Sequence, residues 1–196
     1  MTMKRNLLAS ATVAVLALPM AAQAHLTFFQ GTFAPEALGA TGSGTLAMEY
    51  DDEGHTLAIN ASWSGLSGTA NNAHIHCCTA SPNTGTAGVA LAQSGLLPGF
   101  PLGASSGSYI RVIDLSSTTQ YSAAFVTASG GTALGAENRL MSNLASGQAY
   151  FNIHTTTFGG GEIRAFVTAV PEPGTYALML LGLAGVVAAR RRRRAD

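Results

Sequence analysis

Short runs in which apolar and polar side chains alternate follow one another along most of this chain. Leu46, Met48 and Tyr50 alternate with small or polar residues, and the alternation resumes over residues 57–63 after the turn Asp-Asp-Glu-Gly at 51–54. Because successive side chains of a strand point to opposite faces, two such runs predict a β-hairpin. The acids of the turn are also calcium-type ligands, but without the longer spacing of a calcium loop they indicate a solvated turn.

The same pattern predicts four further strands and a strand through the first histidine pair. One helix is expected at residues 132–144, where Ala136, Leu140 and Leu144 recur every four residues and Gly147 follows as a stop. Between residues 79 and 107 lies a long irregular stretch, which in a compact domain is usually functional or contains short strands. The predicted strands span residues 26–33, 73–78, 109–115, 149–155 and 162–167.

The first 24 residues have the composition of a secretory signal peptide. Lys4 and Arg5 give a positive start, residues 7–18 form an apolar run, and Ala22-Gln23-Ala24 is a small-x-small cleavage sequence. We therefore expect a signal helix that is removed after Ala24, so that the mature chain begins at His25 outside the cytoplasm.

A second apolar segment lies near the carboxyl end. Residues 175–189 carry no charge, and five consecutive arginines follow at 190–194. A helix of this length spans roughly 22 Å, less than the ~30 Å hydrocarbon core, so it would be a marginal permanent anchor. The arginines favour the cytoplasmic side. We expect a transient membrane helix, with a permanent tail anchor as the alternative.

Charge excludes one class of partner once the two ends are set aside. Residues 25–170 contain three arginines, no lysine and eight acids, a net charge of −5. A nucleic-acid partner is therefore not expected. The same residues are rich in Gly, Ala, Ser and Thr, which suits an extracellular all-β protein with many turns.

Residues 73–78, Ala-His-Ile-His-Cys-Cys, hold two of the five histidines and both cysteines. On an extended strand His74, His76 and Cys78 share one face, while Ile75 and Cys77 take the other. Two neutral imidazoles at this spacing can converge on a copper or zinc ion. The alternative is a polar, hydrogen-bonded ladder on a strand face.

The last two predicted strands form a second hairpin, turned by the glycines at 159–161. The register that pairs His154 with Glu162 and Asn152 with Arg164 gives the His154 ring a carboxylate to orient it, as at many metal sites. A slip of two residues also fits. A surface ladder of ion pairs and hydrogen bonds is the alternative interpretation.

The two histidine segments have the same phase if their apolar residues face the core. His74, His76 and His154 then point outward together. We expect a three-histidine cluster for copper or zinc, with Glu162 as orienting partner or fourth ligand. Metal affinity should fall below about pH 6.5, because ligation needs neutral imidazole.

Cys77 and Cys78 are not expected to stay free in an oxidising compartment. They can close a small vicinal disulfide ring, pair with another chain, or add a thiolate to the histidine ligands. The sequence does not choose among these three.

Four motifs occur in a characteristic order: Trp-Ser-Gly-Leu-Ser-Gly at 63–68, Ala-His-Ile-His at 73–76, Tyr-Phe-Asn-Ile-His-Thr at 150–155 and Phe-Gly-Gly-Gly-Glu-Ile-Arg at 158–164. Residues 26–168 thereby resemble the CHRD domain, a module named after chordin and found in many bacterial secreted proteins. The resemblance implies an immunoglobulin-like antiparallel β-sandwich. Gly160 departs from the family's usual proline, which loosens the turn, and Cys77-Cys78 stand where a glycine is common.

The tail resembles a second family. Val-Pro-Glu-Pro-Gly at 170–174, the apolar run and the arginines are similar to the PEP-CTERM sorting signal of Gram-negative bacteria that make exopolysaccharide. The resemblance implies cleavage by an exosortase near Pro171, Glu172 and Pro173, followed by release or attachment at the cell surface. The chain would then comprise a signal peptide (1–24), a CHRD-like domain (25–169) and a sorting tail (170–196).

The resulting functional hypothesis is a non-enzymatic protein of the extracellular matrix or exopolysaccharide layer that binds a metal ion. It is supported by the sequence, in which no set of nucleophile and base and no carboxylate pair stands out. The expected partners are signal peptidase, exosortase and matrix components such as exopolysaccharide.

Two enzymatic alternatives are kept. Residues 65–67 with His74 and His76 resemble the copper-ligand strand of Cu,Zn superoxide dismutase, another β-sandwich. That enzyme uses six histidines and an aspartate, so the five histidines here allow only a mononuclear copper site. Alternatively, His25 at the mature terminus would chelate copper with its amine and ring, as in copper-brace oxygenases.

Overall fold

The computed structural model describes residues 25–92, 94–170, 182–186 and 190. The β-strands of the domain are β1 (Leu26–Pro35), β2 (Ser43–Asp51), β3 (Thr56–Ser64), β4 (Ala70–Cys77), β5 (Val89–Leu91), β6 (Gly107–Asp114), β7 (Ala149–Thr155) and β8 (Ile163–Val170). A 3-10 turn η1 (Thr118–Gln120) and the helices α1 (Ala123–Ala128) and α2 (Ala133–Ala145) lie between β6 and β7.

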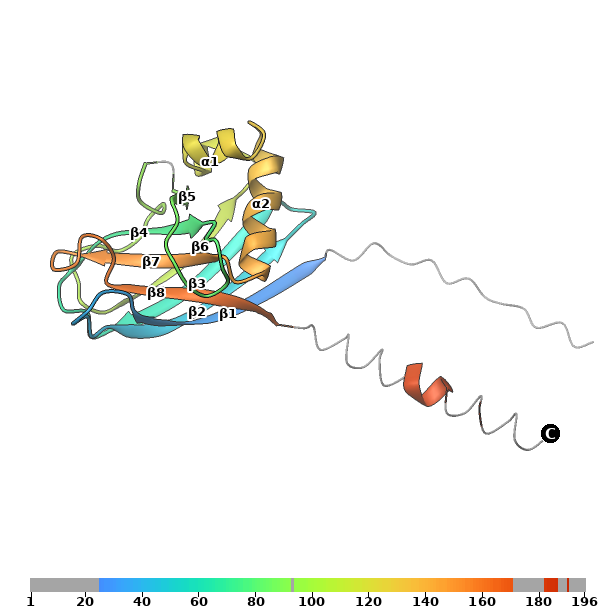
Figure 1. Ribbon diagram of the computed structural model, residues 1–196, viewed down its shortest axis with the longest axis horizontal. Helices are drawn as coiled ribbons and strands as arrows, with labels where there is room; N and C mark the ends of the chain where they lie inside the picture. Colours follow the sequence, from blue (N-terminus) through green and yellow to red (C-terminus); the bar gives the residue numbers. More distant parts are fainter. Residues whose placement is uncertain (1–24, 93, 171–181, 187–189, 191–196) are drawn as a thin grey trace, which may run out of the picture.

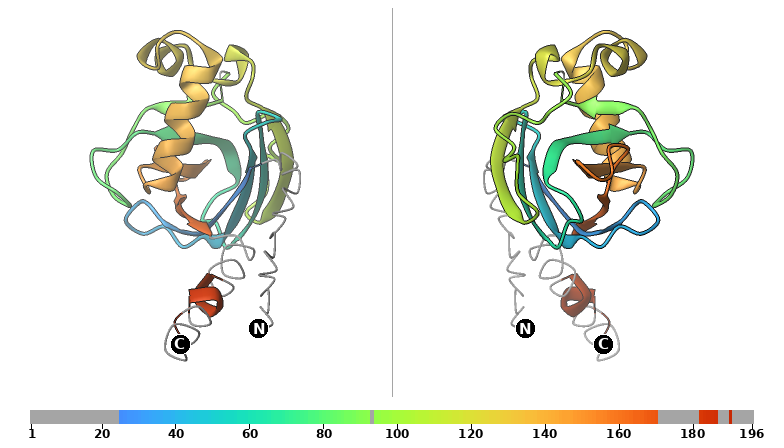
Figure 2. Two further views of the ribbon diagram at one scale, coloured as in Figure 1. Left: turned by 90° about the vertical axis from the view of Figure 1, so that its right-hand side faces the viewer. Right: turned by 90° about the vertical axis from the view of Figure 1, so that its left-hand side faces the viewer.

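The eight strands form one antiparallel sheet in the order β5-β4-β7-β8-β1-β2-β3-β6. Strand β8 joins its two halves, because it pairs with β7 along one edge and with β1 along the other. The sheet curls strongly around a single core (Figures 1 and 2). The all-β prediction is confirmed. The finer prediction, an immunoglobulin-like or dismutase-like sandwich of two sheets, is corrected. The strands form one continuous half-barrel, because β8 pairs with strands of both halves.

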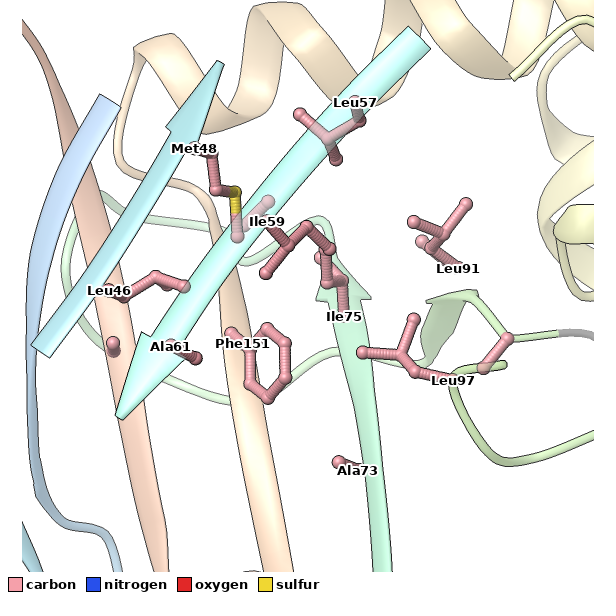
Figure 3. Close-up of a cluster of buried hydrophobic side chains, with 14 of the residues drawn as sticks. Leu46, Met48, Leu57, Ile59, Ala61, Ala73, Ile75, Leu91, Leu97 and Phe151 are labelled. Atoms are coloured by element: carbon pink, nitrogen blue, oxygen red, sulfur yellow. The ribbon is translucent and has the colours of Figure 1, made fainter. Parts of the chain in front are cut away.

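Apolar side chains from the two halves meet inside the curl. Figure 3 shows Met48 and Ile59, from β2 and β3, reaching toward Ile75 of β4 and Phe151 of β7. Ile75 and Phe151 are completely buried. Burial of this kind contributes roughly 1.5–3 kcal/mol for each large apolar side chain and fixes which face of each strand points inward. The histidines, at alternate positions of the same strands, must therefore face out.

The predicted hairpin is formed by β2 and β3, which pair from Ser43↔Ser64 to Asp51↔Thr56. The Asp51 carboxylate accepts hydrogen bonds from the backbone N–H groups of Glu53 and Gly54, at 3.0 and 2.9 Å. These are the local bonds of an Asx turn, in agreement with the solvated-turn interpretation.

Helix α2 confirms the helix predicted at residues 132–144. Thr132 caps it, accepting a hydrogen bond from the Gly135 N–H at 3.0 Å. On its buried side Glu137 accepts a hydrogen bond from the Tyr50 hydroxyl at 2.8 Å and lies 3.0 Å from Nδ1 of His55. The helix is thus tied to the β2–β3 hairpin and lies across one side of the curled sheet (Figure 2). The short helix α1 was not predicted.

The long stretch between β4 and β6 contains a short strand, β5, as such stretches often do. Beyond β5 it continues along the same edge of β4: the Leu97 N–H donates to Ala73 O at 2.9 Å, and the Gly103 N–H donates to Ala70 O at 2.8 Å. This stretch therefore covers the β4 edge and carries backbone carbonyl groups close to the histidines.

The expected signal helix lies outside the described residues. Of the carboxyl-terminal apolar segment, residues 182–186 are described and are helical, as is Arg190 after it. Within the described part of the chain, none of the helices has the length and apolar character needed to cross a membrane.

Candidate metal centre

Strands β4 and β7 place three histidines on the face of the sheet opposite the core. In the register of the two strands, His74 lies opposite Asn152 and Asn72 lies opposite His154. The His74 and His154 residues are only 6% and 9% exposed. Since they face away from the core, loops must cover them on the outside.

The structure brings His74, His76 and His154 together, as the shared phase of the two strands predicts. One ring nitrogen from each residue can be chosen so that all three lie within 4.8 Å of one another. The closest pair is Nε2 of His154 and Nε2 of His74, at 2.9 Å. This geometry suits a single ion with bonds of ~2.0–2.1 Å after small adjustments of the rings.

Each of the three rings is held from behind by a backbone carbonyl. Nδ1 of His74 lies 3.1 Å from Gly95 O, Nδ1 of His76 lies 2.8 Å from Ala87 O, and Nδ1 of His154 lies 2.9 Å from Gly159 O. A carbonyl oxygen can only accept, so each Nδ1 is assigned the proton. In a neutral ring this leaves the lone pair on Nε2, the usual arrangement of a metal-binding histidine.

When both rings are neutral, the contact between Nε2 of His74 and Nε2 of His154 joins two lone pairs. Burial lowers the pKa of His74 to about 4, helped by the neighbouring His76 and His154. Burial also lowers the pKa of His76. At neutral pH the His74 ring therefore supplies no proton for a hydrogen bond between the two Nε2 atoms. A cation between them would turn an unfavourable contact into a favourable one.

An aromatic and ionic layer covers His76. Tyr150 stacks on the His76 ring with centroids 4.8 Å apart. The Arg164 guanidinium lies over the Tyr150 ring, at 5.3 Å, and donates to Gly85 O at 2.6 Å and to Glu36 at 3.3 Å. Sequence patterns did not identify this layer. The unusually long loop was the only signal that the site would be covered.

Glu162 lies elsewhere than predicted. Asn152 does pair with Arg164, but the Glu162 carboxylate accepts from the Ser67 N–H at 2.5 Å and from the Thr155 hydroxyl at 2.6 Å. Burial raises the pKa of Glu162, but these hydrogen bonds outweigh it and hold the pKa below its usual range. A buried carboxylate needs several donors, and Ser67 and Thr155 supply them, whereas Nδ1 of His154 is bonded to Gly159 O.

Cys77 and Cys78 form a disulfide with each other, across a cis peptide bond. Neither cysteine is free. Of the three alternatives for these residues, the structure contains the vicinal disulfide, so Cys78 does not supply a thiolate to the histidines.

The other predicted site residues lie apart from the cluster. His25 is exposed and its backbone N–H donates to Asp52 at 3.2 Å, while His55 binds Glu137 of α2. The processing residues other than His25, namely Ala24, Pro171, Glu172 and Pro173, lie outside the described residues.

A cleft of about 380 Å³ opens onto the cluster from one side. His74 and His154 line it, but His76 does not. The remaining lining residues are Asn71, Asn72 and Gly159.

Two family profiles match the chain. The CHRD domain matches residues 22–167, and the PEP-CTERM protein-sorting motif matches residues 169–194. No curated protein and no solved structure matches it. The sorting motif implies export, sorting to the surface and processing by an exosortase. Because the first profile spans well over half of the chain and includes all three clustered histidines, the protein belongs to the CHRD domain family.

Proposed function

We propose that this protein is a non-enzymatic component of the extracellular or exopolysaccharide layer that holds one copper or zinc ion on its β4–β7 face. One observation carries the metal assignment: a ring nitrogen from each of His74, His76 and His154 lies within 4.8 Å of the other two, while backbone carbonyls fix each Nδ1. Three neutral imidazoles are a donor set that suits copper and zinc, whereas calcium and magnesium prefer oxygen ligands.

The polar-ladder alternative explains the cluster less well. A ladder needs a donor for each acceptor, but the Nε2 atoms of His74 and His154 lie 2.9 Å apart with both Nδ1 protons already used. A mononuclear copper redox enzyme remains the second candidate, and the cleft beside His74 and His154 favours it. A dinuclear dismutase-type site is not supported, because His25 and His55 lie away from the cluster.

Metal content of the exported protein tests the proposal. We expect stoichiometric copper or zinc in the purified wild-type protein and none in His76→Ala, with the fold retained because His76 lies outside the core. His25→Ala is the matched control and should keep the ion. A wild-type protein without metal after reconstitution would overturn the metal assignment. Loss of metal in His25→Ala alone would move the site to the mature amino terminus.

The proposed location is tested separately. After exosortase processing, the intact mass of the native protein should lack both the first 24 residues and the arginine cluster. Recovery of the full-length carboxyl terminus in membranes of an exosortase-containing host would contradict processing and leave the metal proposal unaffected.

A further inference from the structure

We infer that the bound ion keeps one open coordination position, which faces the cleft between Asn72 and Gly159 and takes a small monodentate anion. This inference rests on the proposed metal function. The new element is that one ligand of the ion comes from solution and can exchange, so that protein side chains do not fill the whole coordination sphere.

The number of protein ligands is the first argument. Zn(II) and Cu(II) sites hold at least four ligands, whereas the cluster among the described residues offers three. The residues expected from the sequence as a fourth ligand are engaged elsewhere: Glu162 binds Ser67 and Thr155, and Cys77 and Cys78 are bonded to each other. The fourth ligand must therefore come from solution.

The direction of the opening follows from what surrounds each ring. His76 is covered by Tyr150, whose ring stacks on it, and by the loop that carries Ala87. The cleft reaches the cluster only along the edge formed by His74 and His154. A ligand from solution would thus approach from this side.

Charge favours an anion at this position. Three neutral imidazoles leave the double positive charge of the ion uncompensated, and no residue lining the cleft carries a carboxylate. The Asn72 side-chain oxygen already accepts from the Ala73 N–H at 2.8 Å. This leaves the Asn72 amide hydrogens to donate to a bound anion.

Azide is a suitable probe, because azide bound to Cu(II) absorbs visible light. We expect the Cu(II)-loaded exported protein to develop a saturable charge-transfer band and a changed electron paramagnetic resonance spectrum on azide titration. Copper content after dialysis shows that azide has not removed the ion.

Two adjacent glycines provide a matched pair of variants. Gly159 lines the cleft and Gly160 does not, and a Cβ atom at either position meets nothing within 4 Å. Gly159→Leu should fill the cleft, keep the carbonyl that holds His154, retain copper and lose azide binding. Gly160→Leu should retain both. Asn72→Leu should weaken azide binding about tenfold by removing a donor, whereas Asn60→Leu on β3 should not.

The outcomes separate the two proposals. Stoichiometric copper without an azide response in the wild-type protein would overturn the open position and leave the metal site standing. Equal azide affinity in Gly159→Leu and wild type would also overturn it, because the ligand would then enter elsewhere. Failure to bind copper at all would overturn the proposed function itself.

Discussion

The two halves of the sheet differ in the exposure of their outer faces. Along β3, buried and exposed residues alternate, and Asn60 and Ser62 lie open to solvent. Along β7 every residue is buried, including the outward-facing Tyr150 and His154. Hydrophobicity does not explain the difference, because the covered face carries histidines and an asparagine. Loops that cross only the β4–β7 half decide it.

The exposed half needs no cover around Thr45, Asn60 and Ser62, because these side chains are small, neutral and solvated. It even bears the larger groove, of about 660 Å³, which is lined by Gln30, Thr32, Asn60 and neighbours without a histidine, cysteine or charged residue. The smaller cleft holds the two histidines. In this protein the loops that cover a face, and not the size of its cleft, mark the face able to bind a metal, since they fix each imidazole and burial lowers the pKa of His74 and His76.

Truncating one outward-facing side chain on each half of the sheet should test the comparison most strongly. Tyr150→Ala removes the ring between His76 and Arg164 and should lower the free energy of unfolding by about 3–5 kcal/mol. Ser62→Ala on the open face should change it by less than about 0.5 kcal/mol. Urea denaturation measures both. Similar effects for the two variants would show that the loops contribute no packing.

Acidification should weaken the covered face of the metal-free protein. The pKa of His74 is about 4 when folded and 6.5 in the ordinary case, so the unfolded chain binds more protons between these values. Stability should thus be fully present above pH 6.5 and fall toward pH 4, by on the order of 2–3 kcal/mol from this ring. Proton competition with a metal at His74 moves below pH 6.5 for the same reason.

Urea midpoints at several pH values test this dependence. The decrease of the urea midpoint on acidification should become smaller in His74→Gln and persist in His25→Gln, since His25 is exposed. A flat profile between pH 4.5 and 7 in the wild-type protein would contradict it.

Loosening the loop at residues 83–88, which covers the β4–β7 face, should have a smaller effect on stability. Arg164→Gln removes the donor to Gly85 O and the cation above Tyr150 and Phe166, and should lower stability by about 2 kcal/mol. Hydrogen exchange in residues 83–88 should quicken. Arg139→Gln, which removes a similar cation from Phe125 on the helical side, should leave exchange in that loop unchanged.

The smallest expected effect comes from restricting the turn at residues 159–161, between β7 and β8. No backbone hydrogen bond from the Gly160 N–H occurs among the described residues, and its φ is outside the left-handed region. Gly160→Pro, the residue usual in the family, should raise the free energy of unfolding by about 0.4–1 kcal/mol by restricting the unfolded chain. A drop in the melting temperature would show that the turn needs glycine here.

Much of the site could be predicted because phase is a local property. Alternation around Ile75 and around Ile153 was enough to place His74, His76 and His154 on one face, since a buried residue fixes the direction of its neighbours. Glu162 could not be placed in this way. It follows Gly161, whose φ of 120° interrupts the extended chain. The in-out alternation of β8 therefore does not predict the direction of the Glu162 side chain.

The sequence alone determined every strand except β5, the β2–β3 hairpin, helix α2 and the common phase of the histidines, because each depends on residues a few positions apart. Tertiary structure decided that β8 joins both halves into one curled sheet, that Gly95, Ala87 and Gly159 hold the rings, and that Glu162 turns to Ser67 and Thr155. These contacts join segments up to 95 residues apart. Each of these groups finds its hydrogen-bond partner in competition with all other buried donors and acceptors. A local sequence pattern does not contain that information.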